Sequence, residues 1–533
     1  MKFMNRKQQF QIDTRRMLYA GGFGLMAGVA LVLGYQLQMA GGVTYSKFST
    51  WIGCLVAGLV NILVMYFLLS VSIIYKEKGY GKLGVRWFCV LCFLFLYGCW
   101  GIQLLGVYPG FFNYDAPGQW EMYAVGEVSA HHPVIHTLLI SKCIHWSFDI
   151  FGKSQPGVMV YNLIQMAVTA TAFTQVFRYM YSKKVPKVIV VTSLLWCGMF
   201  PTIVLSVLSV TKDSLFAPLV VSFVMSTICM LEDQEAFFAK WYRMLFWGLT
   251  AVLMTIMRNN AVYVAIPFFV VLIWVVRKYW KKYLILLTGM LLLYGLYVGP
   301  FTTYYTVEGI AGKEYLSVPC QQMMRVYHTR EDVGAEQKEK IESYFETDAL
   351  LLYVPKIADV AKGNLRMDLF DANPAEYLKL WAELGMEYPA EYADAFLLGN
   401  YGFWYPWATL AMYADGTEGY WVCKSYNPVW NESKIYPVMQ YYTLFGYNEM
   451  VCENPVTMWV FAPATYFWIT LAAFVILLYQ KRREAIVFGF VLAVWLTFLL
   501  GPVALVRYVT FLYYLLPLEV ALVILVIKKK EKD

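Results

Sequence analysis

Acidic and imidazole side chains gather in one short stretch of the chain, residues 108–140. This stretch carries three of the five histidines together with Asp115, Glu121 and Glu127. His132 and His136 are four residues apart, a spacing that places two imidazoles on one helix face, as metal ligands often are. With Glu127 or another nearby carboxylate they could hold a divalent cation. Alternatively, His and Pro at a helix entry serve as caps and hydrogen-bonding anchors.

The elements around this stretch are strongly apolar. Of 533 residues, 59% are hydrophobic and only 15% are charged, which exceeds the apolar content of an ordinary soluble domain. A helix needs about 20 apolar residues to cross a hydrocarbon layer of roughly 30 Å. We therefore predict an all-α polytopic membrane protein with about twelve transmembrane helices, near residues 17–39, 52–75, 87–107, 157–180, 188–207, 214–231, 243–257, 261–277, 283–303, 457–480, 485–504 and 508–527.

The Lys and Arg residues set the expected orientation, because cations in short loops are retained on the cytoplasmic side. They concentrate at both termini and in alternate loops, so we expect both termini to face the cytoplasm in the cell membrane. This pattern holds only if residues 133–150 do not cross. Lys142 and Asp149 in that segment would each cost about 2.5–3.5 kcal/mol near the bilayer centre. We predict an interfacial or re-entrant helix there, within an extracytoplasmic loop 108–156.

The chain divides by composition into residues 1–303, 304–455 and 456–533. The middle segment holds 22 of the 36 acidic residues and carries a net charge of −11, against +18 for the rest. We predict a mainly α extracytoplasmic domain there, between the ninth and tenth helices, and two membrane modules around it. Residues 374–396 show helical periodicity, with Pro389 opening a second helix. The net positive charge of the chain outside residues 304–455 reflects membrane topology. We therefore predict no nucleic-acid partner.

The predicted external domain also contains a dense aromatic stretch, "NYGFWYPW". Trp404 and Tyr405 in it could stack on a sugar ring, sit at the headgroup boundary, or form the core of a small domain. Three cysteines fall in the same domain, Cys320, Cys423 and Cys452. They allow one disulfide, of which Cys423–Cys452 is one pairing.

Three cations are exceptions to the rule that Lys and Arg stay on the cytoplasmic side, because the predicted topology places them on the outer face. Lys212, Arg258 and Arg507 lie at predicted outer ends of helices, where other Lys and Arg residues are rare. Together they indicate an anion site, whereas each alone could be an interfacial anchor. Asp213 is placed to pair with one of them.

In chain order these motifs resemble the GT-C superfamily of integral-membrane glycosyltransferases, which includes the protein O-mannosyltransferase and aminoarabinose-transferase types. Those enzymes carry a catalytic Asp in an early external loop and later a His-Pro-Pro-Leu-like helix start. Here "NYDAPGQWEMY" supplies Asp115 and "HHPVIHTLLI" supplies His132. Ala116 and Val134 depart from the family pattern, which indicates a separate bacterial branch. Further matches follow in order: "FPTIVLSVLSVTKDSLF", "MTIMRNNAVYV" and "VRYVTFLYYLLP".

The resemblance implies transfer of a sugar from a polyprenyl-phosphate donor to a glycan, lipid or protein acceptor at the outer membrane face. It implies Asp115 and His132 as catalytic residues, with Asp115 as the base. The remaining candidate roles are donor phosphate binding for Lys212, Arg258 and Arg507, and acceptor or sugar binding for Trp404 and Tyr405. Two other classes stay open: a transporter or flippase, for which Glu519 is a lone intramembrane polar candidate, and a polysaccharide polymerase or ligase.

Overall fold

The computed structural model describes residues 13–528, apart from residues 74–79, 81–82, 308–313, 411–420, 422–424, 447–450 and 452–453. Cys423 and Cys452, the candidate disulfide partners, lie outside the described residues. The described part consists of helices joined by loops, with a few isolated bridges and no β-strand. The predicted all-α polytopic class is confirmed. Helices are expected here because each one satisfies its own backbone hydrogen bonds, which an apolar medium demands.

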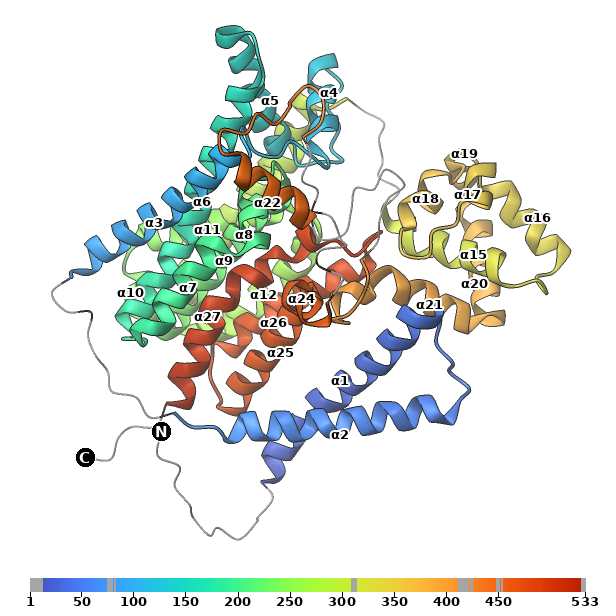
Figure 1. The fold of residues 1–533 in the computed structure, drawn as a ribbon, viewed down its shortest axis with the longest axis horizontal. Coiled ribbons are helices and arrows are strands. Elements are labelled where there is room, and N and C mark those ends of the chain that lie inside the picture. The colour runs from blue at the N-terminus through green and yellow to red at the C-terminus, as the bar shows by residue number, and fades with distance from the viewer. Residues whose placement is uncertain are drawn as a thin grey trace.

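The N-terminal half of the chain supplies most of the bundle, and its first two helices form a hairpin beside it (Figure 1). A π-turn at Tyr297–Phe301, which contains Pro300, joins α13 to α14 in one continuous helix from Arg277 to Tyr305. The helices of this part are α1 (Thr14–Ala40), α2 (Phe48–Ser70), α3 (Val85–Gly106), α4 (Ala116–Val125), α5 (Val134–Phe151), α6 (Gln155–Ser182), α7 (Lys187–Met199), α8 (Pro201–Leu208), α9 (Lys212–Glu232), α10 (Gln234–Phe238), α11 (Trp241–Met257), α12 (Asn260–Val275), α13 (Trp280–Leu296) and α14 (Thr302–Tyr305).

Four C-terminal helices complete the bundle: α24 (Pro455–Phe461), α25 (Pro463–Tyr479), α26 (Ala485–Thr497) and α27 (Thr510–Ile527). Seven described helices, or helices joined end to end, are long and apolar enough to cross a membrane, and nine spans result if each of two bent pairs counts as one. The bends are 49° between α7 and α8 and 60° between α24 and α25. Pro201 and Pro463 begin the second helix of each pair, where a missing N–H interrupts the hydrogen-bond ladder.

Three further predicted spans correspond to shorter apolar helices, at Trp241–Met257, Asn260–Val275 and Ala485–Leu500. The total of twelve spans therefore stays a prediction. Helix α5, predicted not to cross, is not among the helices that meet the length and hydropathy requirements of a span. It lies with α4 at one end of the bundle (Figure 1).

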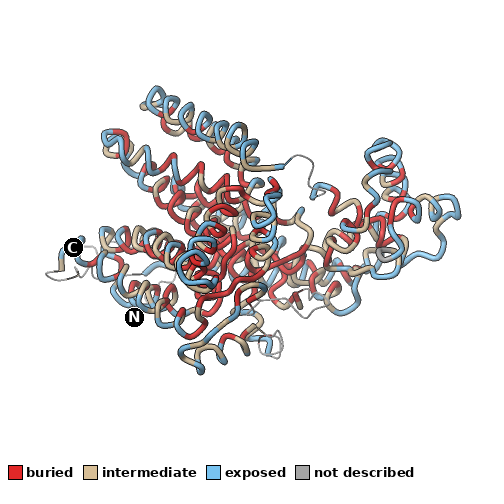
Figure 2. Tube along the Cα trace, turned by 90° about the horizontal axis from the view of Figure 1, so that it is seen from above, coloured by how far each residue is buried: buried red, intermediate tan, exposed pale blue. Residues whose placement is uncertain are grey.

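Buried residues concentrate in the middle of the bundle, and outward helix faces are exposed (Figure 2). Of the apolar window of α9, 83% is buried, whereas the corresponding share is 6% for the helix Arg277–Tyr305. Helix α9 is thus a central helix and α13 a peripheral one. Large buried side chains of the central region include Trp100, Trp247 and Phe173.

The predicted domain 304–455 contributes to more than one hydrophobic core. Residues between Leu316 and Tyr392 form a separate cluster, on helices beside the bundle (Figure 1). Phe403, Trp421 and Tyr442 belong instead to the main core. The predicted helices in 374–396 are confirmed, and Pro389 is the first residue of α21. The helices are α15 (Ser317–Thr329), α16 (Ala335–Tyr344), α17 (Thr347–Leu351), α18 (Ala358–Gly363), α19 (Met367–Ala372), α20 (Pro374–Glu387), α21 (Pro389–Asn400) and α22 (Tyr436–Gly446).

The hairpin of α1 and α2 packs through small residues. A Cβ atom added to Gly28 would lie 2.4 Å from the carbonyl oxygen of Cys54 and 2.4 Å from the backbone nitrogen of Gly58. Only glycine at position 28 permits this approach, which is a common means of helix packing in membranes. The loop after α1 is attached to α15, because Arg325 donates from Nη2 to the Gly41 carbonyl oxygen at 2.8 Å.

Candidate active site

A short parallel bridge joins the loop before Asp115 to the loop before Lys212. The N–H of Phe111 donates to the Leu208 oxygen (2.8 Å), and the N–H of Val210 donates to the Phe111 oxygen (2.9 Å). Leu208 ends α8 and Lys212 begins α9, while Asp115 immediately precedes α4. The bridge therefore fixes the register in which the carboxylate and the ammonium group approach each other.

Two buried amides of α6 hold these loops in place. Asn162 Nδ2 donates to the Pro109 oxygen at 3.0 Å, and Gln165 Nε2 donates to the Ser209 oxygen at 2.9 Å. Gly110 has a φ of 105°, and a Cβ there would lie 2.2 Å from Asn162 Nδ2. The left-handed backbone and the close approach both require glycine at position 110.

Asp115 forms a bidentate ion pair with Arg507, which lies in a 3₁₀ turn just before α27. Nη1 donates to Oδ2 at 3.2 Å, and Nη2 donates to Oδ1 at 3.3 Å. The Nζ atom of Lys212 is 3.4 Å from the same Oδ2. Paired N–H donors on one carboxylate give this contact a specific geometry as well as a favourable charge.

His132 binds Lys212 on the other side. The distance between Lys212 Nζ and His132 Nδ1 is 3.0 Å, and the ammonium must be the donor because it has no acceptor. Nδ1 is therefore unprotonated. Burial, aided by the charge of Lys212, lowers the pKa of His132 to about 3. His132 is thus a neutral imidazole that orients Lys212, and its Nδ1 lies 3.9 Å from Asp115 Oδ2.

Asp213 joins the other two cations to this group. Its carboxylate forms a close ion pair with Arg258, and its Oδ2 is 3.5 Å from Arg507 Nη1. The expected pairing of Asp213 with one of the three cations is therefore observed. The guanidinium of Arg258 lies over the ring of Tyr508 at 4.3 Å, and that of Arg507 over the ring of Tyr114 at 4.4 Å. These cation–π contacts fix both guanidinium planes.

The ion cluster, defined as Asp115, Asp213, Lys212, Arg258 and Arg507, has one more cation than carboxylate. Its side chains are largely buried, with Arg507 only 7% exposed. Nε of Arg507 is buried and has no hydrogen-bond acceptor in the described part of the chain. Excess positive charge together with a spare N–H donor makes this cluster suited to binding an anion.

The charge state of Asp115 follows from its neighbours. Burial opposes its ionisation, but the positive charges of Arg507 and Lys212 outweigh burial and hold the pKa of Asp115 well below its usual value. The carboxylate is therefore ionised at neutral pH. In this ion-paired state it is a weak base, and it becomes a stronger one only when the cations contact another anion.

The suggested metal ligands His132, His136 and Glu127 do not assemble into a site. The described residues contain no group of three or more His, Cys, Asp or Glu side chains placed to hold a metal ion. Both ring nitrogens of His136 are engaged, with Gln119 Oε1 at 3.0 Å and the Tyr161 hydroxyl at 2.8 Å. His136 instead anchors the start of α5, the alternative that its position at a helix entry suggested.

Trp404 and Tyr405 pack where the first helix meets the bundle. Tyr405 is 6% exposed and belongs to a hydrophobic cluster with Leu37 of α1. Nε1 of Trp404 donates to Asn400 Oδ1 at 2.7 Å. Neither contacts the ion cluster through any interaction observed between described residues. These surroundings favour the packing role over acceptor or sugar binding.

Two aromatic residues of the site escaped prediction. Tyr114 has a φ of 55°, which is uncommon for a residue with a side chain, and its ring meets Trp421 edge-on with centroids 6.2 Å apart. Nε1 of Trp421 donates to Ser209 Oγ at 2.7 Å. The only available signal for Tyr114 was its position beside Asp115. No local pattern distinguishes Trp421, which reaches the site from a distant segment.

The fold and the ion cluster define a polytopic all-α membrane protein with a buried charged site at one end of its bundle. The chain belongs to a family of unknown function, DUF6020, whose model matches residues 120–532. The match includes His132, Lys212, Arg258 and Arg507, and it begins just after Asp115. No curated protein and no solved structure matches the chain.

Proposed function

We propose that the protein is a membrane glycosyltransferase that moves a sugar from a polyprenyl-phosphate donor to an extracytoplasmic acceptor. The observation that carries this proposal is the bidentate pair of Asp115 with Arg507 inside a cluster with excess positive charge. Glycosyl transfer needs both kinds of group: cations for the donor phosphate and a carboxylate for the acceptor hydroxyl. The GT-C resemblance assigns the same residues to the same roles.

Donor binding would activate the base. A phosphate that engages Arg507 and Lys212 competes with Asp115 for their charges, and weaker ion pairing raises the proton affinity of the carboxylate. Asp115 then takes the acceptor proton as the bond between the anomeric carbon and the phosphate oxygen breaks. His132 acts as a positioning residue, since it accepts a hydrogen bond from Lys212 at 3.0 Å.

The proposed topology has twelve spans with both termini in the cytoplasm. It counts α7–α8 and α24–α25 as one bent span each and includes the three shorter apolar helices. Helix α5 lies in the membrane interface, so the ion cluster faces the extracytoplasmic side. Orientation rests on the distribution of Lys and Arg in the loops.

A transporter is the second candidate, because bent helices and a buried carboxylate are features of transport proteins. Glu519 is 2% exposed and accepts a hydrogen bond from Thr470. However, the two helix breaks meet through stacked rings of Phe200 and Phe461, whose centroids are 5.2 Å apart. A break packed with aromatic rings serves a structural role better than it serves as an ion or substrate site.

Purified protein in nanodiscs, supplied with lipid-linked sugars extracted from host membranes, tests the proposal. We expect release of free polyprenyl phosphate that depends on an added acceptor extract. Movement of intact lipid-linked sugar across sealed vesicles, without cleavage, would support the flippase alternative and overturn the transferase proposal. Extension of one product into a long polymer would support the polymerase class.

A further inference from the structure

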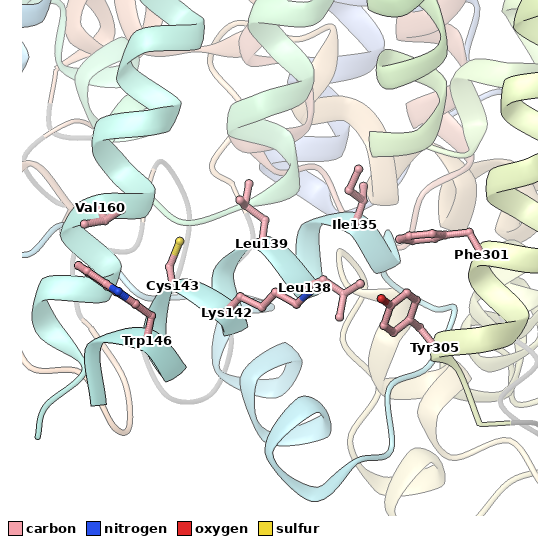
Figure 3. Close-up of a pocket in the computed structure, with 9 residues that line it drawn as sticks. All are labelled: Ile135, Leu138, Leu139, Lys142, Cys143, Trp146, Val160, Phe301 and Tyr305. Carbon is pink, nitrogen blue, oxygen red and sulfur yellow. The ribbon is translucent and has the colours of Figure 1, made fainter. Parts of the chain in front are cut away.

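An apolar groove of about 560 Å³ runs along α5, between this helix, α6 and the end of α14. Its volume falls in the range of roughly 300–1,000 Å³ that is usual for ligand pockets. Phe301 and Tyr305 form one wall and Val160 contributes from α6 (Figure 3). Most of the lining comes from α5: Ile135, Leu138, Leu139, Lys142, Cys143 and Trp146.

One end of the groove lies at the start of α5, close in the chain to His132. Helix α5 starts at Val134, two positions after His132, and Ile135 is the groove residue nearest that end in sequence. One helical turn rises about 5.4 Å, so this end lies within a short distance of His132 and its Lys212 partner. A hydrophobic cluster joins Val134 and Leu138 of α5 to Phe301 and Tyr305 and so holds the two walls together.

Lys142 gives the groove a charge. It is the only charged side chain among the described residues that line the groove, and no described carboxylate lines it. The side chain extends along the groove toward Leu138, in the direction of the helix start (Figure 3). A cation within an apolar surface is complementary to an amphiphile that has hydrocarbon chains and a negative headgroup.

We propose that the groove binds the acceptor, an anionic membrane lipid with a hydroxylated headgroup. This inference rests on the proposed glycosyl transfer and names its acceptor class. The hydrocarbon chains lie against Cys143 and Trp146, the lipid phosphate contacts Lys142, and the headgroup extends past Ile135 to Asp115. Along α5 the lipid thus meets apolar side chains and then Lys142, and beyond the start of α5 its headgroup meets Asp115 in the loop before α4.

The reaction balances with this acceptor. The headgroup oxygen forms a bond to the anomeric carbon, while the bond from that carbon to the donor phosphate oxygen breaks. The leaving phosphate keeps the bonding electrons and is neutralised by Arg507 and Lys212. The hydroxyl proton passes to Asp115. The products are a glycosylated anionic lipid and polyprenyl phosphate.

Photolabelling of the full-length protein in nanodiscs tests the site. The probe is a photoactivatable phosphatidylglycerol in a phosphatidylcholine bilayer, with photoactivatable phosphatidylcholine as the neutral comparison. We expect phosphatidylglycerol to label residues between Leu138 and Trp146. Lys142→Gln should lower this labelling about five-fold, since one lysine near an anionic headgroup contributes about that factor. It should leave labelling by phosphatidylcholine unchanged.

Lys153→Gln is the matched control, because Lys153 is an exposed lysine in the loop after α5 that does not line the groove. It should label as the wild type does. Leu139→Trp, which fills the groove, should remove labelling by both lipids. Equal phosphatidylglycerol labelling in wild type and Lys142→Gln would overturn the proposal. Displacement of the label by polyprenyl phosphate would also overturn it, because the groove would then hold the donor.

A transfer assay with the same nanodiscs separates the two proposals. Sugar recovered in the anionic lipid fraction, and reduced by Leu139→Trp, supports both. Sugar recovered only on a water-soluble glycan, with polyprenyl phosphate released, keeps the transferase function and overturns the lipid acceptor. Absence of donor cleavage with any acceptor overturns the transferase function and, with it, the acceptor assignment.

Discussion

The carboxylate of Asp115 and the guanidinium of Arg507 are 392 positions apart in the chain and meet in a bidentate pair. The pair explains how a partly buried acid remains charged, since burial alone would favour its neutral form. In the proposed mechanism the ion pair sets a requirement, because the base must be released from its cations before it can accept a proton. Binding of the donor phosphate at the same cations would meet this requirement.

Asp115→Asn keeps the size of the side chain and one acceptor oxygen but removes the base. We expect sugar transfer to fall by about 10²–10⁴-fold, the usual contribution of general-base catalysis. Glu121→Gln is the control, because Glu121 is an exposed carboxylate of α4, and its transfer rate should stay near wild type. Acceptor-dependent release of polyprenyl phosphate measures both. A wild-type rate in Asp115→Asn would rule out Asp115 as the base.

Arg507→Lys keeps the positive charge and tests whether two parallel N–H groups of Arg507 bind the donor phosphate. Lysine cannot donate two parallel N–H bonds to one anion, so donor affinity should fall about ten-fold, in line with one charge-assisted hydrogen bond of about 1.5–3 kcal/mol. Titration with lipid-linked sugar measures the affinity. Arg330→Lys, at a partly exposed position of the external helices, should bind donor normally. Unchanged affinity in Arg507→Lys would refute bidentate binding.

Two helices, α5 and α6, are connected to the ion cluster and differ in what they contribute. Helix α6 positions the loops of Asp115 and Lys212 through the amides of Asn162 and Gln165. Helix α5 extends from the site along an apolar groove, which begins at Ile135, ends at Trp146 and carries one cation, Lys142. The site thus depends on buried amide contacts as much as on the charged residues themselves.

Gly28→Leu tests the close packing of α1 and α2. A side chain at position 28 meets backbone atoms of Cys54 and Gly58, so the helices must separate, and overpacking of this kind typically costs about 1–3 kcal/mol. We expect a lower thermal unfolding temperature for the detergent-solubilised protein. Gly22→Leu is the control, since a Cβ at Gly22 meets nothing within 4 Å. Equal unfolding temperatures for the two variants would contradict the close approach of α1 and α2 at Gly28.

At the scale of the molecule, a group of helices with its own core, between Leu316 and Tyr392, lies beside the bundle of apolar helices. The two parts are joined near the site, because the Ala358 N–H donates to the Pro502 oxygen at 2.8 Å. Pro502 precedes the turn that carries Arg507. Movement of the external helices would therefore be transmitted to the cation that binds Asp115.

Cysteine labelling determines the topology of the whole chain. In a variant without native cysteines, Gln155→Cys should react with a membrane-impermeant maleimide from outside, and Glu232→Cys only after permeabilisation. The physical basis is retention of loop cations on the cytoplasmic side, combined with a non-crossing α5. The opposite labelling pattern would refute the proposed orientation and place the ion cluster inside the cell.

The sequence alone determined the all-α polytopic class of the protein and the approximate positions of its long apolar helices. Hydropathy is a local property, and a run of apolar residues in lipid must satisfy its own backbone hydrogen bonds. For this reason each of the twelve apolar segments contains a described helix, although not all of them meet the requirements of a span, and Pro389 opens α21 as predicted. Charge and sidedness also marked Lys212, Arg258 and Arg507 as a group before any contact was known.

Only the tertiary structure decided which groups meet. The pairing of Asp115 with Arg507 joins residues separated by 392 positions, and no local pattern specifies such a contact. Likewise, His132 and His136 share a helical spacing, yet one binds Lys212 and the other binds Gln119 and Tyr161. Tyr405 packs against α1 rather than lining the ion cluster. Each outcome depends on long-range packing, which sets distances that sequence periodicity leaves open.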